Sequence, residues 1–215
     1  VKKLDHKQNQ NLLFNIIVPL FNAEQYIEKC LKSILKQSYK RFQVQVVDDC
    51  SSDSSYEIAS SICGVNKNFK IFKNSRRIGA LNNISNLLDT KIKEPSRTVD
   101  LIIDGDDYLY SGDVLNIVKE KYLETNCLIT YGSHISSKGI QGKKYPRLIR
   151  EFNLFRKYFW YGSHLRTFRH DLWLAINPQD LLNIKKEHYP VAWDLAIMFP
   201  MLEMAGKRQE FISEI

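Results

Sequence analysis

Two groups of aspartates stand directly after apolar runs in this chain of 215 residues. The first is Asp48-Asp49, and the second is Asp104-Gly-Asp-Asp107. The second group has three carboxylates within four residues, which repel one another unless a cation or hydrogen-bond donors compensate them, so it predicts a hard-cation site. Oxygen ligands favour Mg²⁺ or Mn²⁺ over Zn²⁺. A solvated turn or an acid-rich helix start would use the same residues, and this short motif alone does not separate the interpretations.

Alternating strand and helix patterns position both acidic groups. Apolar, β-branched runs predict strands at 14–20, 42–47, 69–72 and 99–103, and periodic apolar residues or caps predict helices at 23–36, 53–62 and 79–88. Pro19 is expected to end the first strand because proline cannot donate to a ladder. Strands joined by helices form βαβ crossovers and a mostly parallel sheet, whose ligands bind at the carboxyl ends of the strands. Both acidic groups fall at that edge.

The second half of the chain is less regular. A helix is expected at 113–123 and a strand at 127–131, followed by a long loop or lid over 132–160 because Gly and Pro interrupt the pattern there. A final helix is expected at 193–205, closed by Gly206. The chain stops in a strand-like run, 211–215, which favours a domain cut from a longer polypeptide.

Composition indicates one compact soluble domain, with 44% hydrophobic and 26% charged residues. No apolar run reaches the roughly 18 residues of a membrane span, and residues 1–11 lack the apolar stretch of a signal peptide, so no integral membrane segment is expected. Four dispersed cysteines form no CxxC pair, which favours free thiols in a reducing compartment and a cytoplasmic location.

The net charge of +7 is concentrated in one part of the sequence. Between Lys138 and His170 nine Lys and Arg residues face a single acid, Glu151. A basic stretch of this kind suits a nucleic-acid-binding module. The acidic Asp104 group argues against a nucleic-acid backbone crossing that edge, so no nucleic-acid partner is expected.

Five segments together resemble the family 2 glycosyltransferases of the GT-A fold. They are Ile17–Asn22, Val46–Asp53, Asn74–Gly79, Asp104–Asp107 and Ala192–Gly206, in this order. The resemblance implies an α/β fold with a Rossmann-like, mostly parallel sheet flanked by helices and a C-terminal acceptor-side segment. It implies a single domain over 1–215, with a nucleotide-binding half at about 14–110 and an acceptor-binding half at 111–215.

The resemblance also implies roles for individual residues on the donor side. Pro19, Leu20 and Asn22 would line the nucleotide pocket. Asp49 would contact the base, and Arg77 the pyrophosphate or base. The Asp-x-Asp motif falls on Asp104, which would touch the ribose, and on Asp106, which would hold the metal. Asp107 would share the metal shell, so the implied ligand set for Mn²⁺ or Mg²⁺ is Asp104, Asp106 and Asp107.

On the acceptor side the family's catalytic base falls on Asp194, although the usual preceding acid is replaced by Trp193. His164 and Arg166 lie in a stretch that resembles the family's acceptor side, and we expect them to bind diphosphate or acceptor. A core histidine and surface arginines would have the same sequence, so both interpretations stay open. Glu203, further along the same helix, is expected to be structural.

The function implied is inverting transfer of a sugar from a UDP- or GDP-sugar, with UDP favoured, to a hydroxyl of a glycan or glycoprotein acceptor. A sugar-nucleotide nucleotidyltransferase is the alternative enzyme. It would need a glycine-rich phosphate loop after the first strand, and Pro19–Asn22 has no glycine. A non-catalytic nucleotide- or nucleic-acid-binding module and an inactive transferase also remain open.

Overall fold

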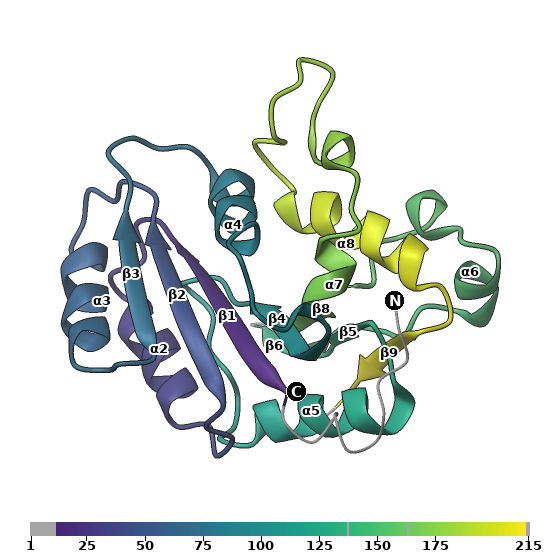
Figure 1. Cartoon of the computed structure of the whole chain (residues 1–215), viewed down its shortest axis with the longest axis horizontal. Coiled ribbons are helices and arrows are strands. Elements are labelled where there is room, and N and C mark those ends of the chain that lie inside the picture. Colours follow the sequence, from purple (N-terminus) through teal and green to yellow (C-terminus); the bar gives the residue numbers. More distant parts are fainter. Residues whose placement is uncertain (1–11, 137, 163, 214–215) are drawn as a thin grey trace.

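The computed structural model describes residues 12–136, 138–162 and 164–213. Its centre is a seven-stranded sheet of order β3-β2-β1-β4-β8-β5-β9 (Figure 1). The strands are β1 (Leu13–Leu20), β2 (Phe42–Asp48), β3 (Phe69–Lys73), β4 (Thr98–Ile102), β5 (Ile129–Gly132), β8 (Arg166–Arg169) and β9 (Gln209–Ile212). All neighbouring strands pair in parallel except β8, which is antiparallel to both β4 and β5. The expected mostly parallel α/β sheet is confirmed.

Helices cover both faces of the sheet and enclose two cores. On one face lie α2 (Ile27–Leu35), α3 (Ser55–Gly64) and α5 (Val114–Thr125). On the other lie α4 (Ala80–Leu88), α6 (Arg147–Glu151), α7 (His170–Trp173) and α8 (Trp193–Ala205). Successive strand residues point to opposite faces, so Ile16 packs in the first core and Ile17 in the second. Figure 1 shows α3 and α4 on opposite sides of β1, β2 and β3.

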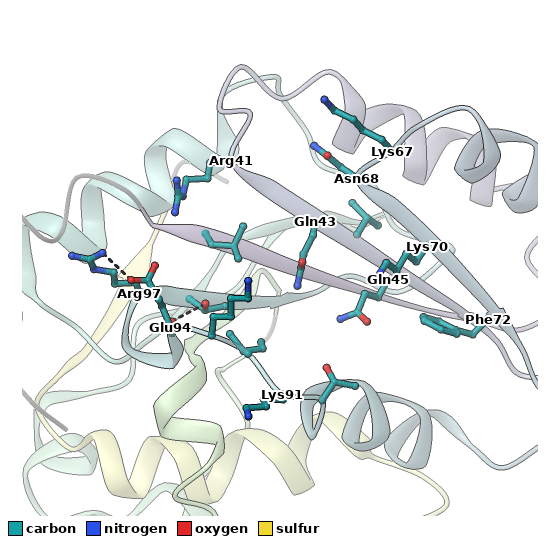
Figure 2. Close-up of a pocket in the computed structure, with 16 residues that line it drawn as sticks. Arg41, Gln43, Gln45, Lys67, Asn68, Lys70, Phe72, Lys91, Glu94 and Arg97 are labelled. Carbon is teal, nitrogen blue, oxygen red and sulfur yellow. Dashed lines mark hydrogen bonds and ion pairs between the residues drawn. The ribbon is translucent and has the colours of Figure 1, made fainter.

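The α4 face is covered only in part. Gln43, Gln45 and Val47 alternate along β2 and therefore share one face. Val47 packs in the core beneath α4, whereas Gln43 and Gln45 line an open groove of about 670 Å³ near the amino ends of the strands (Figure 2). The side chains change from apolar to polar where the helix cover ends.

Pro19 lies within the first strand, which ends at Leu20 as predicted, and does not interrupt its pairing. It pairs in register with Val47, and β1 continues to Leu20. On the opposite side β4 has already ended, and the Pro19 carbonyl accepts a hydrogen bond from Gly105 N at 3.1 Å. In a strand the N–H and C=O of one residue point to the same side, so the missing N–H of Pro19 faces a loop and leaves the β2 ladder intact.

The expectation of a long irregular loop over 132–160 is wrong, because this segment contains regular secondary structure. It contains a hairpin, β6 (His134–Ser136) and β7 (Gly139–Gln141), then α6 and a 3₁₀ turn, η2 (Phe155–Lys157). Two further 3₁₀ turns are η1 (Pro95–Arg97) and η3 (Pro178–Leu181). Strand β8 was also not expected. The final helix and its Gly206 end are confirmed.

The remaining expectations concern the ends of the chain and the cysteines. The final strand β9 begins slightly earlier than expected, and residues 214–215 and the segment 1–11, judged for a signal peptide, lie outside the described residues. All four cysteines are free thiols, with Cys50 exposed and the others buried. No helix in the described ranges is long and apolar enough to cross a membrane.

Candidate functional site

The candidate site lies where β1, β2 and β4 end side by side, as the sequence predicts. The acidic loop after β4 is fixed by its backbone: Ile103 N donates to Ile17 O at 3.1 Å, and Asp107 N donates to Asp104 O at 2.9 Å. Gly105 lies against β1, where an added Cβ would stand 3.0 Å from Leu20 Cδ1. The same Cβ would stand 3.2 Å from the Pro19 carbonyl oxygen, so a side chain at this position would require the loop or its neighbours to shift by a few tenths of an ångström.

A pocket of about 380 Å³ opens at this edge. It is lined by most residues that the sequence assigns to the nucleotide: Pro19, Leu20, Asn22, Asp49, Arg77, Asp104 and Asp106. It also includes residues that the sequence analysis did not select for the donor: Phe21, Ala23, Tyr26, Ala80, Asn83, Gly105 and Trp193. Segments as distant in sequence as the end of β1 and the start of α8 therefore meet in one pocket, which we call the donor pocket.

Asp49 holds the loop that carries Arg77. Its carboxylate accepts hydrogen bonds from Ile78 N and Gly79 N, both at 2.9 Å, and from the Asn74 side chain at 2.9 Å. Burial opposes ionisation, but these hydrogen bonds outweigh it and hold the pKa of Asp49 below its ordinary value. Asp49 is therefore a structural anchor of the pocket wall, and its contact with a base stays a prediction.

Arg77 lies at the mouth of the donor pocket. Its side chain is 66% exposed and its Nε is 3.8 Å from Asp49 Oδ2. The guanidinium stacks 3.8 Å from the centre of the Phe21 ring, a cation–π contact that orients an exposed arginine at little cost. Phe21 is thus a site residue that the sequence analysis missed, although its place between Leu20 and Asn22 marks it in hindsight.

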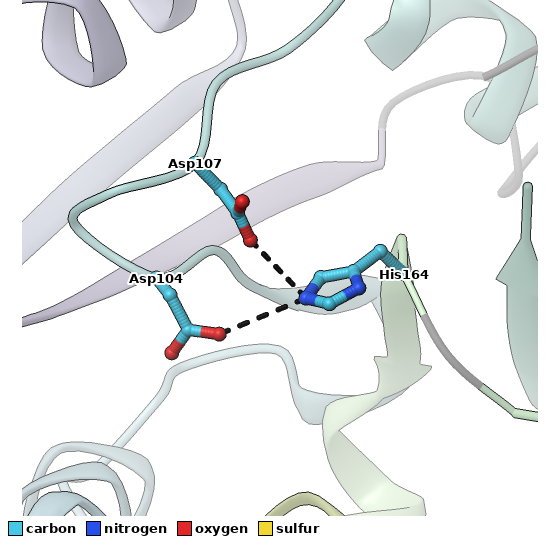
Figure 3. Close-up of side chains that lie close together, drawn as sticks. All are labelled: Asp104, Asp107 and His164. Atoms are coloured by element: carbon cyan, nitrogen blue, oxygen red, sulfur yellow. Dashed lines mark ion pairs between the residues drawn. The ribbon is translucent and has the colours of Figure 1, made fainter. Parts of the chain in front are cut away.

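Asp104, Asp107 and His164 form a compact cluster beside the pocket (Figure 3). His164 Nε2 lies 3.1 Å from Asp107 Oδ2 and 3.8 Å from Asp104 Oδ2. One ligand atom from each residue lies within 4.8 Å of the others. This grouping differs from the ligand set that the sequence analysis expected, because His164 joins it while Asp106 lines the donor pocket.

The charges in this cluster are mutually dependent. Burial disfavours the charged form of His164, but its hydrogen bonds to Asp104 and Asp107 outweigh this effect and raise its pKa. The hydrogen bond with His164 lowers the pKa of Asp107. For Asp106, burial and then the neighbouring carboxylates raise the pKa. Burial and carboxylate repulsion thus oppose ionisation of Asp106, whereas the pairing of His164 with Asp107 favours the charged form of both.

Arg166 joins this cluster to the first turn of α8. It is 4% exposed, and its guanidinium lies 3.4 Å from Asp104 Oδ2, 2.9 Å from His164 Nε2 and 3.7 Å from Asp194 Oδ2. It also stacks on the Trp193 ring at 4.7 Å. His164 and Arg166 therefore both contact the acidic residues of the candidate site, and Arg166 is buried rather than at the surface. One cation faces both Asp104 and the base expected at Asp194.

The basic stretch does not form a single surface. Arg147 pairs with Glu151 on α6, and Arg156 pairs with Glu203 at 2.7 Å, which gives Glu203 the structural role expected of it. Arg169 is buried and donates to backbone carbonyls at 2.8 and 3.1 Å. Four of the nine basic residues of this stretch are thus engaged in helix packing, strand packing or the acidic cluster.

The histidine of β6 is a further neighbour that the sequence analysis missed. His134 stacks edge-to-face on His164, with ring centroids 5.0 Å apart. Burial and then the charge of His164 lower the pKa of His134, which keeps a neutral imidazole against the cluster. No local pattern marks His134, since it lies in a short exposed hairpin.

The fold is that of a GT-A domain, an α/β domain that here has acidic residues directly after β4. The model of the glycosyl transferase family 2 matches residues 15–181. The chain therefore belongs to the family 2 glycosyltransferases.

The chain is similar in sequence to known glycosyltransferases over part of their length. The chain is 28% identical over 134 residues to glycosyltransferase GlyA of Streptococcus pneumoniae, covering 62% of this chain and 18% of the relative. It is 30% identical over 140 residues to the poly(ribitol-phosphate) beta-N-acetylglucosaminyltransferase TarS of Staphylococcus aureus, covering 62% and 22%. The chain thus spans less than a quarter of either relative.

Solved structures show the same fold. The S. aureus TarS structure superposes with a TM-score of 0.69 at 21% identity, covering 95% of this chain and 36% of that one. A complex of TarS residues 1–349 with UDP-GlcNAc gives 0.66 at 22% identity, covering 95% and 57%. Mannosyltransferase PcManGT from Pyrobaculum calidifontis, in complex with GDP-Man and Mn²⁺, gives 0.55 at 20% identity, covering 78% and 47%.

Proposed function

We propose that this chain transfers a sugar from a nucleoside-diphosphate sugar to a hydroxyl of a glycan or glycoconjugate, with inversion at the anomeric carbon. The observation that carries the proposal is the donor pocket, in which the ends of β1 and β4 meet the first turn of α8. A UDP-sugar is the favoured donor because TarS structures are described with UDP and UDP-GlcNAc. PcManGT, which superposes less well, is described with GDP-Man.

The chain's own residues are suited to hold the donor. Pro19, Leu20 and Asn22 form one wall, in the half of the chain at about 14–110 assigned to the nucleotide. Arg77 is exposed at the mouth of the pocket and is suited to neutralise a diphosphate. Asp104 borders both the pocket and the cluster. This position is suited to contact either the ribose of the donor or a metal ion bound to its diphosphate.

The residues present fit a divalent cation. Asp104 and Asp107 offer carboxylate oxygens, and His164 offers a ring nitrogen within reach of both, a mixed set compatible with Mn²⁺ and, through its carboxylates, with Mg²⁺. Asp106 remains a proposed ligand from the pocket side. When bound, such an ion would stabilise the negative charge that develops on the leaving diphosphate.

Asp194 is the proposed general base. It would accept the proton of the acceptor hydroxyl while that oxygen forms a bond to the anomeric carbon and the bond from that carbon to the diphosphate oxygen breaks. Arg166 contacts Asp194 and Asp104 from a buried strand, so it positions the base relative to the donor. A single displacement inverts the anomeric configuration, and the described cluster needs no additional nucleophile.

The experiment compares donor binding with turnover. UDP-GlcNAc, other UDP-sugars and GDP-Man are titrated with and without Mn²⁺ by thermal shift and calorimetry, and donor hydrolysis or transfer is then followed with the ligands that bind. Asp194→Asn should keep donor affinity within about twofold and lower turnover at least about 100-fold, the usual range for a general base.

The matched control is Asp180→Asn, which removes an exposed carboxylate of η3 in the same half of the chain. It should leave binding and turnover unchanged. Full turnover by Asp194→Asn would remove Asp194 from the mechanism, and absence of any metal-dependent donor binding would refute the proposed function itself.

A further inference from the structure

The groove introduced with Figure 2 shares no lining residue with the donor pocket. Its floor is made by Gln43 and Gln45 of β2, and its rim carries six cationic side chains against one carboxylate, Glu94. The cationic residues are Arg41, Lys67, Lys70, Lys91, Lys93 and Arg97. Figure 2 shows Arg41, Lys67, Lys70 and Lys91 on different sides of the groove, so the positive charge surrounds the cavity instead of extending from one edge.

The single acid does not balance this charge. Glu94 is paired with Arg97, at 3.0 Å between Oε1 and Nη1. The other basic side chains come from the start of β2, the turn before β3, β3 itself and the segment after α4. Cations brought together from four parts of the chain repel one another, so an anionic ligand is the partner that lowers the energy of this arrangement.

The groove floor is pre-arranged and polar. Gln43 and Gln45 both donate to Asn15 Oδ1, at 3.0 and 2.9 Å, and Asn15 in turn donates to the buried Asp100 at 2.7 Å. This chain of hydrogen bonds fixes the two amides on the sheet surface, so their remaining donors and acceptors are available to a ligand without further ordering.

We propose that this groove binds a linear polyanion built of polar, non-aromatic units. A volume of about 670 Å³ ringed by six cations exceeds what one phosphate or carboxylate can contact, which favours a ligand with several charged groups. The groove and the donor pocket both border α4, which contributes Ala80 to the pocket and is followed by Thr90 at the groove. The nine residues of α4 span about 14 Å, a distance that an extended polymer can bridge.

Other occupants fit less well. Residues 1–11 carry three lysines and one aspartate and would repel the rim. A second copy of the chain has its densest acidic run at Asp104–Asp107, which belongs to the donor edge. Among the described residues, Phe72 is the one aromatic side chain lining the groove, too few for the base stacking of single-stranded nucleic acid. A concave polar floor does not suit a lipid surface either, because lipid surfaces are bound by protruding apolar side chains.

The test measures polyanion binding to the folded chain. Inorganic polyphosphate, orthophosphate, an oligo-dT with the same number of phosphates and vesicles of anionic phospholipid are titrated at several salt concentrations. We expect polyphosphate to bind with a steep salt dependence and orthophosphate to bind at least about 100-fold more weakly, since it reaches only a few of the cations. Tighter binding of oligo-dT or of vesicles than of polyphosphate would overturn the proposal.

Variants locate the site. Lys70→Glu/Lys91→Glu should weaken polyphosphate at least about tenfold and flatten its salt dependence. The matched control Lys185→Glu/Lys207→Glu makes the same charge change at exposed positions outside the groove and should change affinity less than about threefold, a long-range charge effect. Equal losses in the two variants would refute the assignment.

The result is independent of the sugar-transfer proposal. UDP-sugar affinity should be the same in the wild type and in both double variants, because the donor pocket lies at the opposite end of α4. Circular dichroism checks that each variant is folded, and Lys67→Glu/Lys93→Glu provides a second groove variant. Loss of donor binding with polyphosphate binding intact would count against the proposed function and leave the groove assignment standing.

Discussion

Replacing Arg166 with methionine tests the central ion-pair arrangement of the site. The substitution keeps a long apolar chain but removes the cation between Asp104 Oδ2, at 3.4 Å, and Asp194 Oδ2, at 3.7 Å. Breaking a fully buried pair costs about 3 to 5 kcal/mol. The two carboxylate side chains are 27% and 23% exposed, so solvent screens part of their repulsion. We therefore expect the free energy of unfolding to fall by about 2 kcal/mol.

The assay is urea unfolding at pH 7, followed by circular dichroism. Arg156→Met is the matched control: its guanidinium pairs with Glu203, but the two side chains are 52% and 28% exposed, so a loss of about 0 to 1 kcal/mol is expected. Arg166→Lys should fall between the two because an ammonium keeps the charge without the planar fork that reaches both acids. A loss in Arg166→Met no larger than in Arg156→Met would refute the reasoning.

Three further predictions concern the loops around the pocket. The pKa of Asp49 is lowered because its hydrogen bonds outweigh burial. The free energy of unfolding that the wild type gains over Asp49→Asn from the ionised carboxylate should therefore be complete above the unfolded pKa of about 3.9 and should be lost as pH falls through the folded pKa. Urea unfolding at a series of pH values measures this difference. Gly105→Ala should weaken donor binding at least about tenfold by calorimetry, because its Cβ would press on Leu20, whereas Gly64→Ala, with no atom within 4 Å, should not. His164→Gln should remove most of the thermal shift caused by Mn²⁺ alone, and an unchanged shift would exclude His164 from the cation site.

The strands that carry the acidic groups could be predicted because their sequence is locally consistent. The mainly apolar runs 14–20 and 42–47 are followed by polar residues at Asn22 and Asp48, so both the strands and their edge position are evident. The acidic loop then follows β4 at the carboxyl edge by topology alone. The donor-side residues taken from the family resemblance meet in one pocket, whereas Asp107, His164, Arg166 and Asp194 lie outside its lining.

Strand β8 could not be predicted, because its charged residues do not match the apolar pattern of a buried strand. Arg166 and Arg169 begin and end a strand in which both are nearly fully buried, and charged residues ordinarily argue against that position. Their charges are satisfied by distant groups: Arg169 donates to Ser96 O, and Arg166 contacts Asp104. Only the tertiary structure supplies these partners, so a single-sequence pattern has no signal for the strand.

Counting charge along the sequence located one basic region and missed another. The stretch 138–170 stands out because it holds nine basic residues and one acid, yet Arg147 and Arg156 are paired with acids in the structure. The groove cations come from segments separated by up to 56 positions, from Arg41 to Arg97, with six acids between them, so no short stretch of sequence contains all six cations. Proximity after folding, rather than composition, decides which charges act together.

The donor pocket is organised by side chains as well as by the sheet, and this bears on how it can bind. The turn after β1 is joined to the turn after β2: Ser52 N donates to Asn22 Oδ1 at 2.9 Å, Ala23 N to Ser55 Oγ at 2.7 Å, and Ser54 N to Glu24 Oε2 at 3.0 Å. Backbone ordering costs about 1 to 2 kcal/mol per residue. These hydrogen bonds hold the two turns without a ligand, so their backbone is ordered when the chain folds. A nucleotide that enters the pocket therefore does not have to supply the free energy of ordering them.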